Sequence, residues 1–201
     1  MRCGQSSFPR NRFIILRILS SAMLLAILLA PKIALGEHTA FDLDGKAVNP
    51  LEVASGKVVV LVFLRLDCPV SSRYAPIIQQ ISEQHEPDAV FWLVFPDKDE
   101  TPQTIRKYLQ NYAYHLPALR DPEHALVKLS QVQITPEVAV FNGNHQLVYD
   151  GRIDNWYVDL NRSRPAATTH ELEEAIHAAH EGSVPPKNQV RGVGCYISDL
   201  E

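Results

Sequence analysis

Buried-strand and helical patterns alternate through the middle of the chain. Two predominantly apolar runs, at residues 57–66 and 89–95, predict strands that are buried on both faces of a sheet. Between them, residues 69–85 carry apolar side chains at helical spacing, and Pro69 suits the first turn of a helix. The pattern therefore predicts a β-α-β unit in which Cys68 lies at the junction of strand and helix.

The pattern continues on both sides of this unit. An Asp-Gly turn predicts a small hairpin over residues 41–48. Residues 101–114 and 122–131 favour helices, and residues 137–142 and 146–152 favour two antiparallel strands joined through Gly143-Asn144. Because a parallel β-α-β crossover is right-handed, the closing hairpin is expected to add to the same sheet. The predicted fold class is α/β, with a mixed central sheet flanked by helices.

The last third of the chain predicts one more helix and a tail. Thr168 and Glu171 have the spacing of a capping box before a helix that runs to about residue 181. Residues 184–201 contain Pro and Gly without periodicity, which is typical of an extended C-terminal segment. Residues 37–183 are then the domain, and residues 184–201 are a tail that carries Cys195.

Residues 1–36 have the layout of a secretory signal. Basic residues precede an apolar run at residues 18–30, and small residues follow at 34 and 36. The run is shorter than the roughly 20 residues of a spanning helix, so cleavage is expected, with an uncleaved N-terminal anchor as the alternative. The predicted location is periplasmic or secreted, with membrane attachment only if the leader stays in place.

Composition and charge limit the classes of molecule that the protein is expected to bind. The 201 residues are 46% hydrophobic and 21% charged, as in an ordinary globular protein. Loss of the leader, which has five basic and no acidic residues, would leave 14 Lys and Arg against 23 Asp and Glu, a net charge of −9. Such a charge argues against nucleic acid as a partner. No sequence feature calls for a cofactor, and none is expected.

Two segments resemble the thioredoxin superfamily. The run VVLVFLRLDCPVSSRYAP looks like its active-site strand and helix, with Pro76 as the helix-kinking proline. Thr135-Pro136 before EVAVFN resembles its cis-proline loop. Together with the hairpin at 41–48, the segment TPEVAVFNGNHQLVYDGRI is similar to the redoxin branch, the AhpC/TSA group with its exported thiol-disulfide relatives. The resemblance covers about residues 38–182 and implies a thioredoxin-like fold with antioxidant or thiol-disulfide oxidoreductase activity in cell redox homeostasis.

The candidate nucleophile is Cys68. A helix N-terminus offers unpaired N–H groups and partial positive charge, which favour a thiolate over a thiol. The motif is Cys68-Pro69-Val70-Ser71, so Ser71 replaces the second cysteine of a CxxC site, and the peroxiredoxin signature PxxxTxxC is also absent. The resemblance adds Thr135 and Pro136 as catalytic residues facing the thiol.

Cys195 is the candidate resolving thiol. It follows two glycines within Gly192–Gly194, which permit close backbone approach, and about 13 tail residues could span roughly 20 Å. In an exported protein, Cys68 and Cys195 could form a disulfide. A merely structural disulfide and a free thiol that pairs between chains are the alternatives. The expected substrate is a protein disulfide or a peroxide, and an external thiol would be the reductant.

Further residues are expected around the thiolate. The final hairpin strand runs back toward the sheet edge where Cys68 lies, so residues 153–165 should form an active-site loop. Arg65 would stabilise a thiolate and Asp67 would oppose it, whereas residues 97–100 are expected to be a solvated turn. The full set of expected neighbours is Arg65, Asp67, Ser71, Arg73, Arg152, Asp154, Trp156, Tyr157 and Arg164.

Two other functions remain open at this point. A Sco-like copper module could hold copper(I) through Cys68, Cys195 and a histidine such as His170, although position 72, where a CxxxC motif would need its second cysteine, is serine. A non-catalytic thioredoxin-fold domain could instead recognise a partner through the surface around Pro136 and Trp156. The main prediction, a thiol oxidoreductase, includes no metal site.

Overall fold

The computed structural model describes Met1, residues 39–54 and residues 56–198. The predicted leader therefore lies outside the described residues. Among the residues that are described, no helix is both long and apolar enough to cross a membrane.

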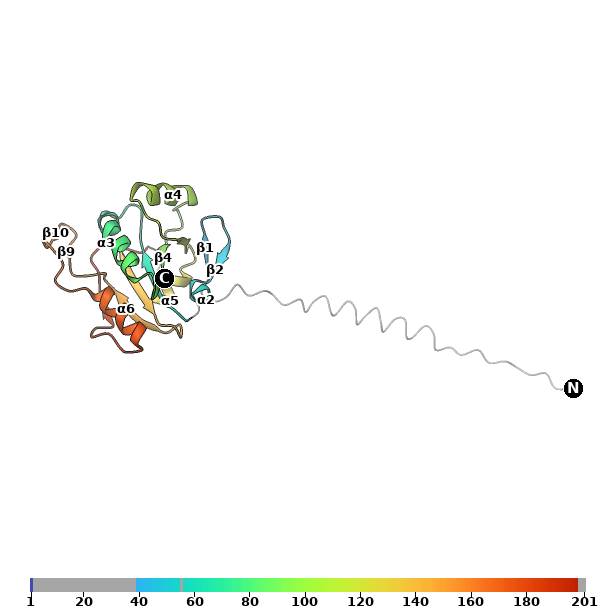
Figure 1. Ribbon diagram of the computed structural model, residues 1–201. Coiled ribbons are helices and arrows are strands. Elements are labelled where there is room, and N and C mark those ends of the chain that lie inside the picture. Colours follow the sequence, from blue (N-terminus) through green and yellow to red (C-terminus); the bar gives the residue numbers. More distant parts are fainter. Residues whose placement is uncertain (2–38, 55, 199–201) are drawn as a thin grey trace. The chain divides into compact units, whose positions relative to one another are not determined.

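The domain is built on an eight-stranded mixed sheet (Figure 1). Its strand order is β11-β8-β7-β3-β4-β5-β1-β2. β3 pairs in parallel with β4 and antiparallel with β7, so it is the central strand. The strands are β1 (Ala40–Asp42), β2 (Ala47–Val48), β3 (Val58–Phe63), β4 (Ala89–Phe95), β5 (Ala118–Arg120), β7 (Glu137–Phe141), β8 (Leu147–Gly151) and β11 (Gln189–Val190).

Helices cover both faces of this sheet because alternate residues of its strands point to opposite sides. Val58, Val60 and Val62 of β3 pack with α3, α4 and α6, whereas Val59, Leu61 and Phe63 pack with α2 and α5. The helices are α2 (Pro50–Val53), α3 (Pro69–His85), α4 (Pro102–Asn111), α5 (Ala125–Ser130) and α6 (Glu171–Glu181). The thioredoxin-like α/β fold expected from the sequence is confirmed.

Several local predictions differ from the structure. The predicted capping box at Thr168 is wrong: His170 is the N-cap of α6 and makes no side-chain cap bond. Glu171 instead accepts hydrogen bonds from Arg152 and from the Thr169 hydroxyl, because Arg152 offers its carboxylate a charged donor. The helix predicted over residues 101–114 ends at Asn111. Two residues further on, Ala113 has a positive φ of 53°, which a right-handed helix does not allow.

The segments predicted to be irregular contain four short strands outside the main sheet. β9 (Tyr157–Asp159) and β10 (Arg162–Ser163) form a hairpin within the predicted active-site loop. β6 (Ile134–Thr135) pairs antiparallel with β12 (Cys195–Tyr196) of the tail. The tail is therefore docked on the domain, because pairing with β6 and β8 satisfies backbone groups that no sequence periodicity reveals.

Candidate functional site

Cys68 caps the N-terminus of α3, after the central strand β3. Its backbone is extended (φ −85°, ψ 111°), and Pro69 occupies the first helical position, where a missing N–H costs nothing. The Cys68 sulfur is 3.1 Å from the carbonyl oxygen of Thr135, and the residue is 0% exposed. The nucleophile expected from the sequence is thus buried against the loop that contains Pro136.

The loop facing Cys68 also holds the tail. The peptide bond between Thr135 and Pro136 is cis, as the resemblance implied. Cys195 lies opposite Thr135 in the pairing of β12 with β6, and the Thr135 hydroxyl donates to the Cys195 carbonyl at 3.3 Å. The Cys195 thiol forms a side-chain hydrogen bond with Cys68. Both cysteines are free thiols in this structure, placed side by side.

The surroundings push the pKa values of the two thiols apart. Burial raises the pKa of Cys68, but hydrogen bonds from the Cys195 thiol and from the Ser71 and Val70 backbone outweigh it, so the pKa lies below its ordinary value. Burial and the adjacent Cys68 sulfur raise the pKa of Cys195 to about 12. Deprotonation is therefore easier at Cys68 than at Cys195, whose thiol donates a hydrogen bond to the Cys68 sulfur.

Ser71 is the neighbour of Cys68 that most directly replaces a second active-site cysteine. Its hydroxyl is buried next to the sulfur and has no other hydrogen-bond partner among the described residues. A hydroxyl oriented this way supports the thiolate as a donor but cannot form a disulfide. The second thiol of the site comes from the tail instead of from the first turn of α3.

Arg65 acts on the tail more than on Cys68. Its guanidinium is within 3.2 Å of the carboxylates of Asp67 and Asp97, and it donates to the Tyr196 carbonyl at 3.1 Å. Two carboxylates compensate its charge, so little of it is left to stabilise a thiolate. The guanidinium instead ties β12 to the segment that leads into Cys68.

The C-terminal half of the tail is anchored independently of the cysteines. The Ile197 N–H donates to the Gln133 carbonyl at 2.9 Å, and its side chain is buried in the core. Glu137, which is 0% exposed, accepts from the Gly192 N–H at 2.8 Å and forms an ion pair with Arg191. These contacts hold Cys195 in place whatever the state of its sulfur.

The predicted active-site loop approaches the first turns of α3 through Tyr157. Arg73 donates to the Tyr157 hydroxyl at 3.3 Å. Residues from the start of α3 and from the β9–β10 hairpin line a cavity of about 280 Å³ there, namely Pro69, Val70, Arg73, Tyr157, Leu160, Asn161 and Ser163. Tyr157 and Arg73 thus lie beside the helix end that carries Cys68.

The other loop residues build the scaffold of the loop. Trp156 donates its indole N–H to the Arg164 carbonyl at 2.9 Å and packs edge-on against Tyr74, 5.4 Å between ring centres. Asp154 accepts from the Tyr74 hydroxyl at 2.5 Å. Arg152 is hydrogen-bonded to Glu171 of α6, so it fastens the loop to that helix.

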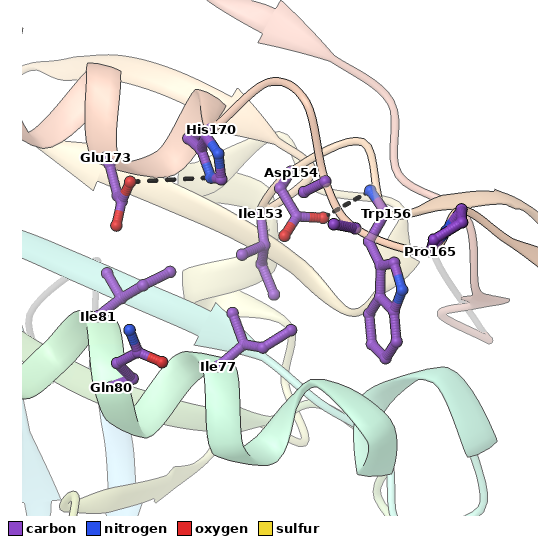
Figure 2. Close-up of a pocket in the computed structure, with 11 residues that line it drawn as sticks. Ile77, Gln80, Ile81, Ile153, Asp154, Trp156, Pro165, His170 and Glu173 are labelled. Carbon is purple, nitrogen blue, oxygen red and sulfur yellow. Dashed lines mark hydrogen bonds and ion pairs between the residues drawn. The ribbon is translucent and has the colours of Figure 1, made fainter.

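A second cavity of about 380 Å³ is lined by Trp156 and by residues of α3 (Figure 2). Ile77 and Ile81 of α3 face Ile153 across it, and His170 and Glu173 stand at the end away from Trp156. The His170 ring nitrogen is 3.8 Å from the Glu173 carboxylate. Within the described ranges, no group of three or more His, Cys, Asp and Glu side chains is placed to hold a metal ion.

Glu100 is a neighbour of the site that sequence reasoning missed. The prediction of a solvated turn at residues 97–100 is wrong for this residue, which is buried and accepts from the Leu66 N–H at 2.7 Å. Burial raises the pKa of Glu100 to about 7, and its second oxygen has no hydrogen-bond partner among the described residues. The acidic run DKDE gave no signal of this because burial is decided by the packing of the Leu66 segment.

Glu100→Gln is expected to flatten the pH dependence of stability. The folded protein retains the Glu100 proton up to about pH 7, whereas an unfolded chain loses it near 4.5. The stability contributed by the protonated form is therefore present below pH 4.5 and lost as the pH rises to 7, at a cost of about 3 kcal/mol. Urea unfolding of both proteins between pH 4 and 8 measures this, and an equal decline in the variant would contradict it. Asp99→Asn, at an exposed position of the same turn, is the control.

Comparison with known proteins agrees with the fold. A sequence model of a thioredoxin-like family matches residues 56–147. An uncharacterised conserved protein from Geobacillus kaustophilus is similar over 79% of this chain and 86% of its own, with 22% identity and a TM-score of 0.65. A secreted disulfide oxidoreductase of Mycobacterium tuberculosis, homologous to E. coli DsbE, is similar over 71% and 96%, with 19% identity and a TM-score of 0.52.

DsbF from the same organism is similar over 73% of this chain and 97% of its own, with 21% identity and a TM-score of 0.55. The comparison with curated proteins gives no significant match. The family match over residues 56–147 and the similar structures agree on a thioredoxin-like fold. Its fold resembles that of thiol-disulfide oxidoreductases of the DsbE and DsbF type.

Proposed function

We propose that this chain is an exported thiol oxidoreductase whose redox centre is the pair Cys68 and Cys195. One observation carries the proposal: the Cys195 thiol donates a hydrogen bond to a Cys68 sulfur at a helix N-terminus. The lowered pKa of Cys68 increases its thiolate fraction, and Cys195 supplies a second thiol that is hydrogen-bonded to it. Export is supported by the signal-like leader and by the likeness to a secreted disulfide oxidoreductase.

The chemistry has two steps with either class of oxidant. The Cys68 thiolate attacks a disulfide and expels one thiolate, or attacks a peroxide and becomes a sulfenic acid as hydroxide or alkoxide leaves. Cys195 then attacks the Cys68 sulfur. The second thiolate, or water formed with the Cys195 proton, leaves, and the Cys68–Cys195 disulfide remains. External thiols return the pair to the reduced state.

The proposal is tested by mass spectrometry of the mature protein under non-reducing conditions. Treatment with a few equivalents of hydrogen peroxide or of 2-hydroxyethyl disulfide should convert both thiols into one intramolecular disulfide. Cys68→Ser and Cys195→Ser should each lose this product. Two thiols that remain free to alkylation after both oxidants would overturn the proposal, and a product from only one oxidant would identify the substrate class.

A further inference from the structure

The two sulfurs of the proposed redox pair are unequally accessible. Cys68 is 0% exposed and lies within the core between the sheet and α3, among Val70 and Tyr74. Cys195 is partly exposed, and the next residue, Tyr196, is 72% exposed. The outer strand β12 thus lies between Cys68 and the outside.

This difference in accessibility determines which sulfur an external thiolate can attack in thiol-disulfide exchange. The incoming thiolate attacks one sulfur along the line of the bond that breaks, so that the other sulfur leaves on the opposite side. Attack on Cys68 would come from the side away from Cys195, through the apolar core beneath α3. Attack on Cys195 would come from the side away from Cys68, where the tail faces outward.

The geometry points to a reversal of roles once a peroxide has oxidised the pair, and we propose that external thiols then exchange at Cys195 while Cys68 is the sulfur that leaves. This rests on the proposed function, because it presupposes the Cys68–Cys195 disulfide. The tail keeps Cys195 outermost in that state as well, since its anchors at Gln133, Glu137 and Ile197 do not involve either sulfur.

The electrostatics of the site favour the same direction. A thiol of lower pKa is the better leaving group in exchange. The hydrogen bonds at the start of α3 hold the pKa of Cys68 below its ordinary value, whereas burial and the Cys68 sulfur raise the pKa of Cys195 to about 12. Accessibility and leaving-group strength therefore both favour attack at Cys195, with Cys68 as the leaving thiolate.

The reaction balances with two external thiols. A first thiol loses its proton to solvent, and its thiolate bonds to the Cys195 sulfur as Cys68 leaves as a thiolate. A second thiolate then attacks the external sulfur of this mixed disulfide, and Cys195 leaves and takes up a proton. Two thiols have become one disulfide, and the pair is reduced by two electrons.

The test locates the mixed disulfide. The oxidised full-length mature protein is mixed with 2-mercaptoethanol, quenched with acid within milliseconds to seconds, alkylated and mapped by mass spectrometry. The adduct is expected on Cys195 at least about tenfold more often than on Cys68, with Cys68 alkylated. Adducts found mainly on Cys68 would overturn the inference while leaving the redox pair intact. If the oxidised protein contains no Cys68–Cys195 disulfide, the proposed function fails, and this inference fails with it.

A matched pair of variants in β12 and the residue after it tests the covering role of the tail. Ile197→Ala removes a buried anchor and should raise the share of adduct on Cys68 several-fold. Tyr196→Ala removes an exposed side chain of the same segment and should leave the share unchanged. An Ile197→Ala protein that is folded by circular dichroism and keeps the wild-type share would contradict the role of the tail.

Discussion

Gly194→Ala is expected to detach β12 from the domain and expose Cys68. A Cβ atom at this position would lie 2.0 Å from the Thr135 carbonyl oxygen and 2.7 Å from its carbon, far inside any real contact. Both are backbone atoms of β6, so neither can turn aside, and the strands must separate. Iodoacetamide should then alkylate Cys68 at least about tenfold faster than in the wild-type protein, because its thiolate loses the cover of the tail. Timed alkylation of the reduced protein measures the rate.

The control for Gly194→Ala is Gly182→Ala, at the end of α6. Gly182 has a φ of +69° and open space where a Cβ would be, so the substitution strains the backbone without touching the redox pair. The substitution should lower the free energy of unfolding by roughly 1 kcal/mol. It therefore tests whether general destabilisation alone exposes Cys68. Equal alkylation rates in the two variants would contradict a local opening at Gly194.

Glu137→Gln is expected to have the second largest effect, on both stability and the tail. The Glu137 carboxylate is fully buried and accepts from the backbone N–H groups of Gln133 and Gly192 while it pairs with Arg191. An amide keeps one acceptor oxygen and turns an NH₂ group toward donors. The free energy of unfolding should fall by about 3 kcal/mol, as for a broken buried pair. Urea unfolding at pH 7 measures this.

The tail should respond more strongly than the rest of the domain in Glu137→Gln. The rate of amide hydrogen exchange should rise first at Gly192 and Ile197. The Gly192 N–H donates to Glu137, and the Ile197 N–H donates to Gln133, which is itself bonded to Glu137. Glu174→Gln, at an exposed position of α6, is the control and should change neither quantity. A loss below about 0.5 kcal/mol in Glu137→Gln would mean that the carboxylate does not hold the tail.

Sequence patterns predict the parts of the site that depend on a single strand or helix. The run that became β3 is apolar on both faces, and a helical pattern follows Pro69, so the position of Cys68 at a helix N-terminus follows from periodicity alone. The cis peptide bond before Pro136 was implied by the resemblance, not by periodicity. Local patterns succeed here because burial on both faces and the first turn of a helix each constrain residue types.

Pairing across long distances could not be predicted in the same way. The contact of Cys195 with Thr135 joins residues that are 60 positions apart through a two-residue strand, which is too short to give an alternating pattern. Glu137 and Glu100 look like ordinary charged residues in the sequence, yet both are buried. Each accepts a hydrogen bond from a backbone N–H of a distant segment, Gly192 for Glu137 and Leu66 for Glu100.

By itself, the sequence determined the thioredoxin-like sheet, the helix that begins after Cys68 and the presence of a second thiol in the tail. Only the tertiary structure decided that this thiol is docked against the first, that Cys68 is covered and that Cys195 is the outer sulfur. The physical reason is that periodicity reports which face of an element is buried, whereas accessibility of a sulfur depends on what other segments lay over it.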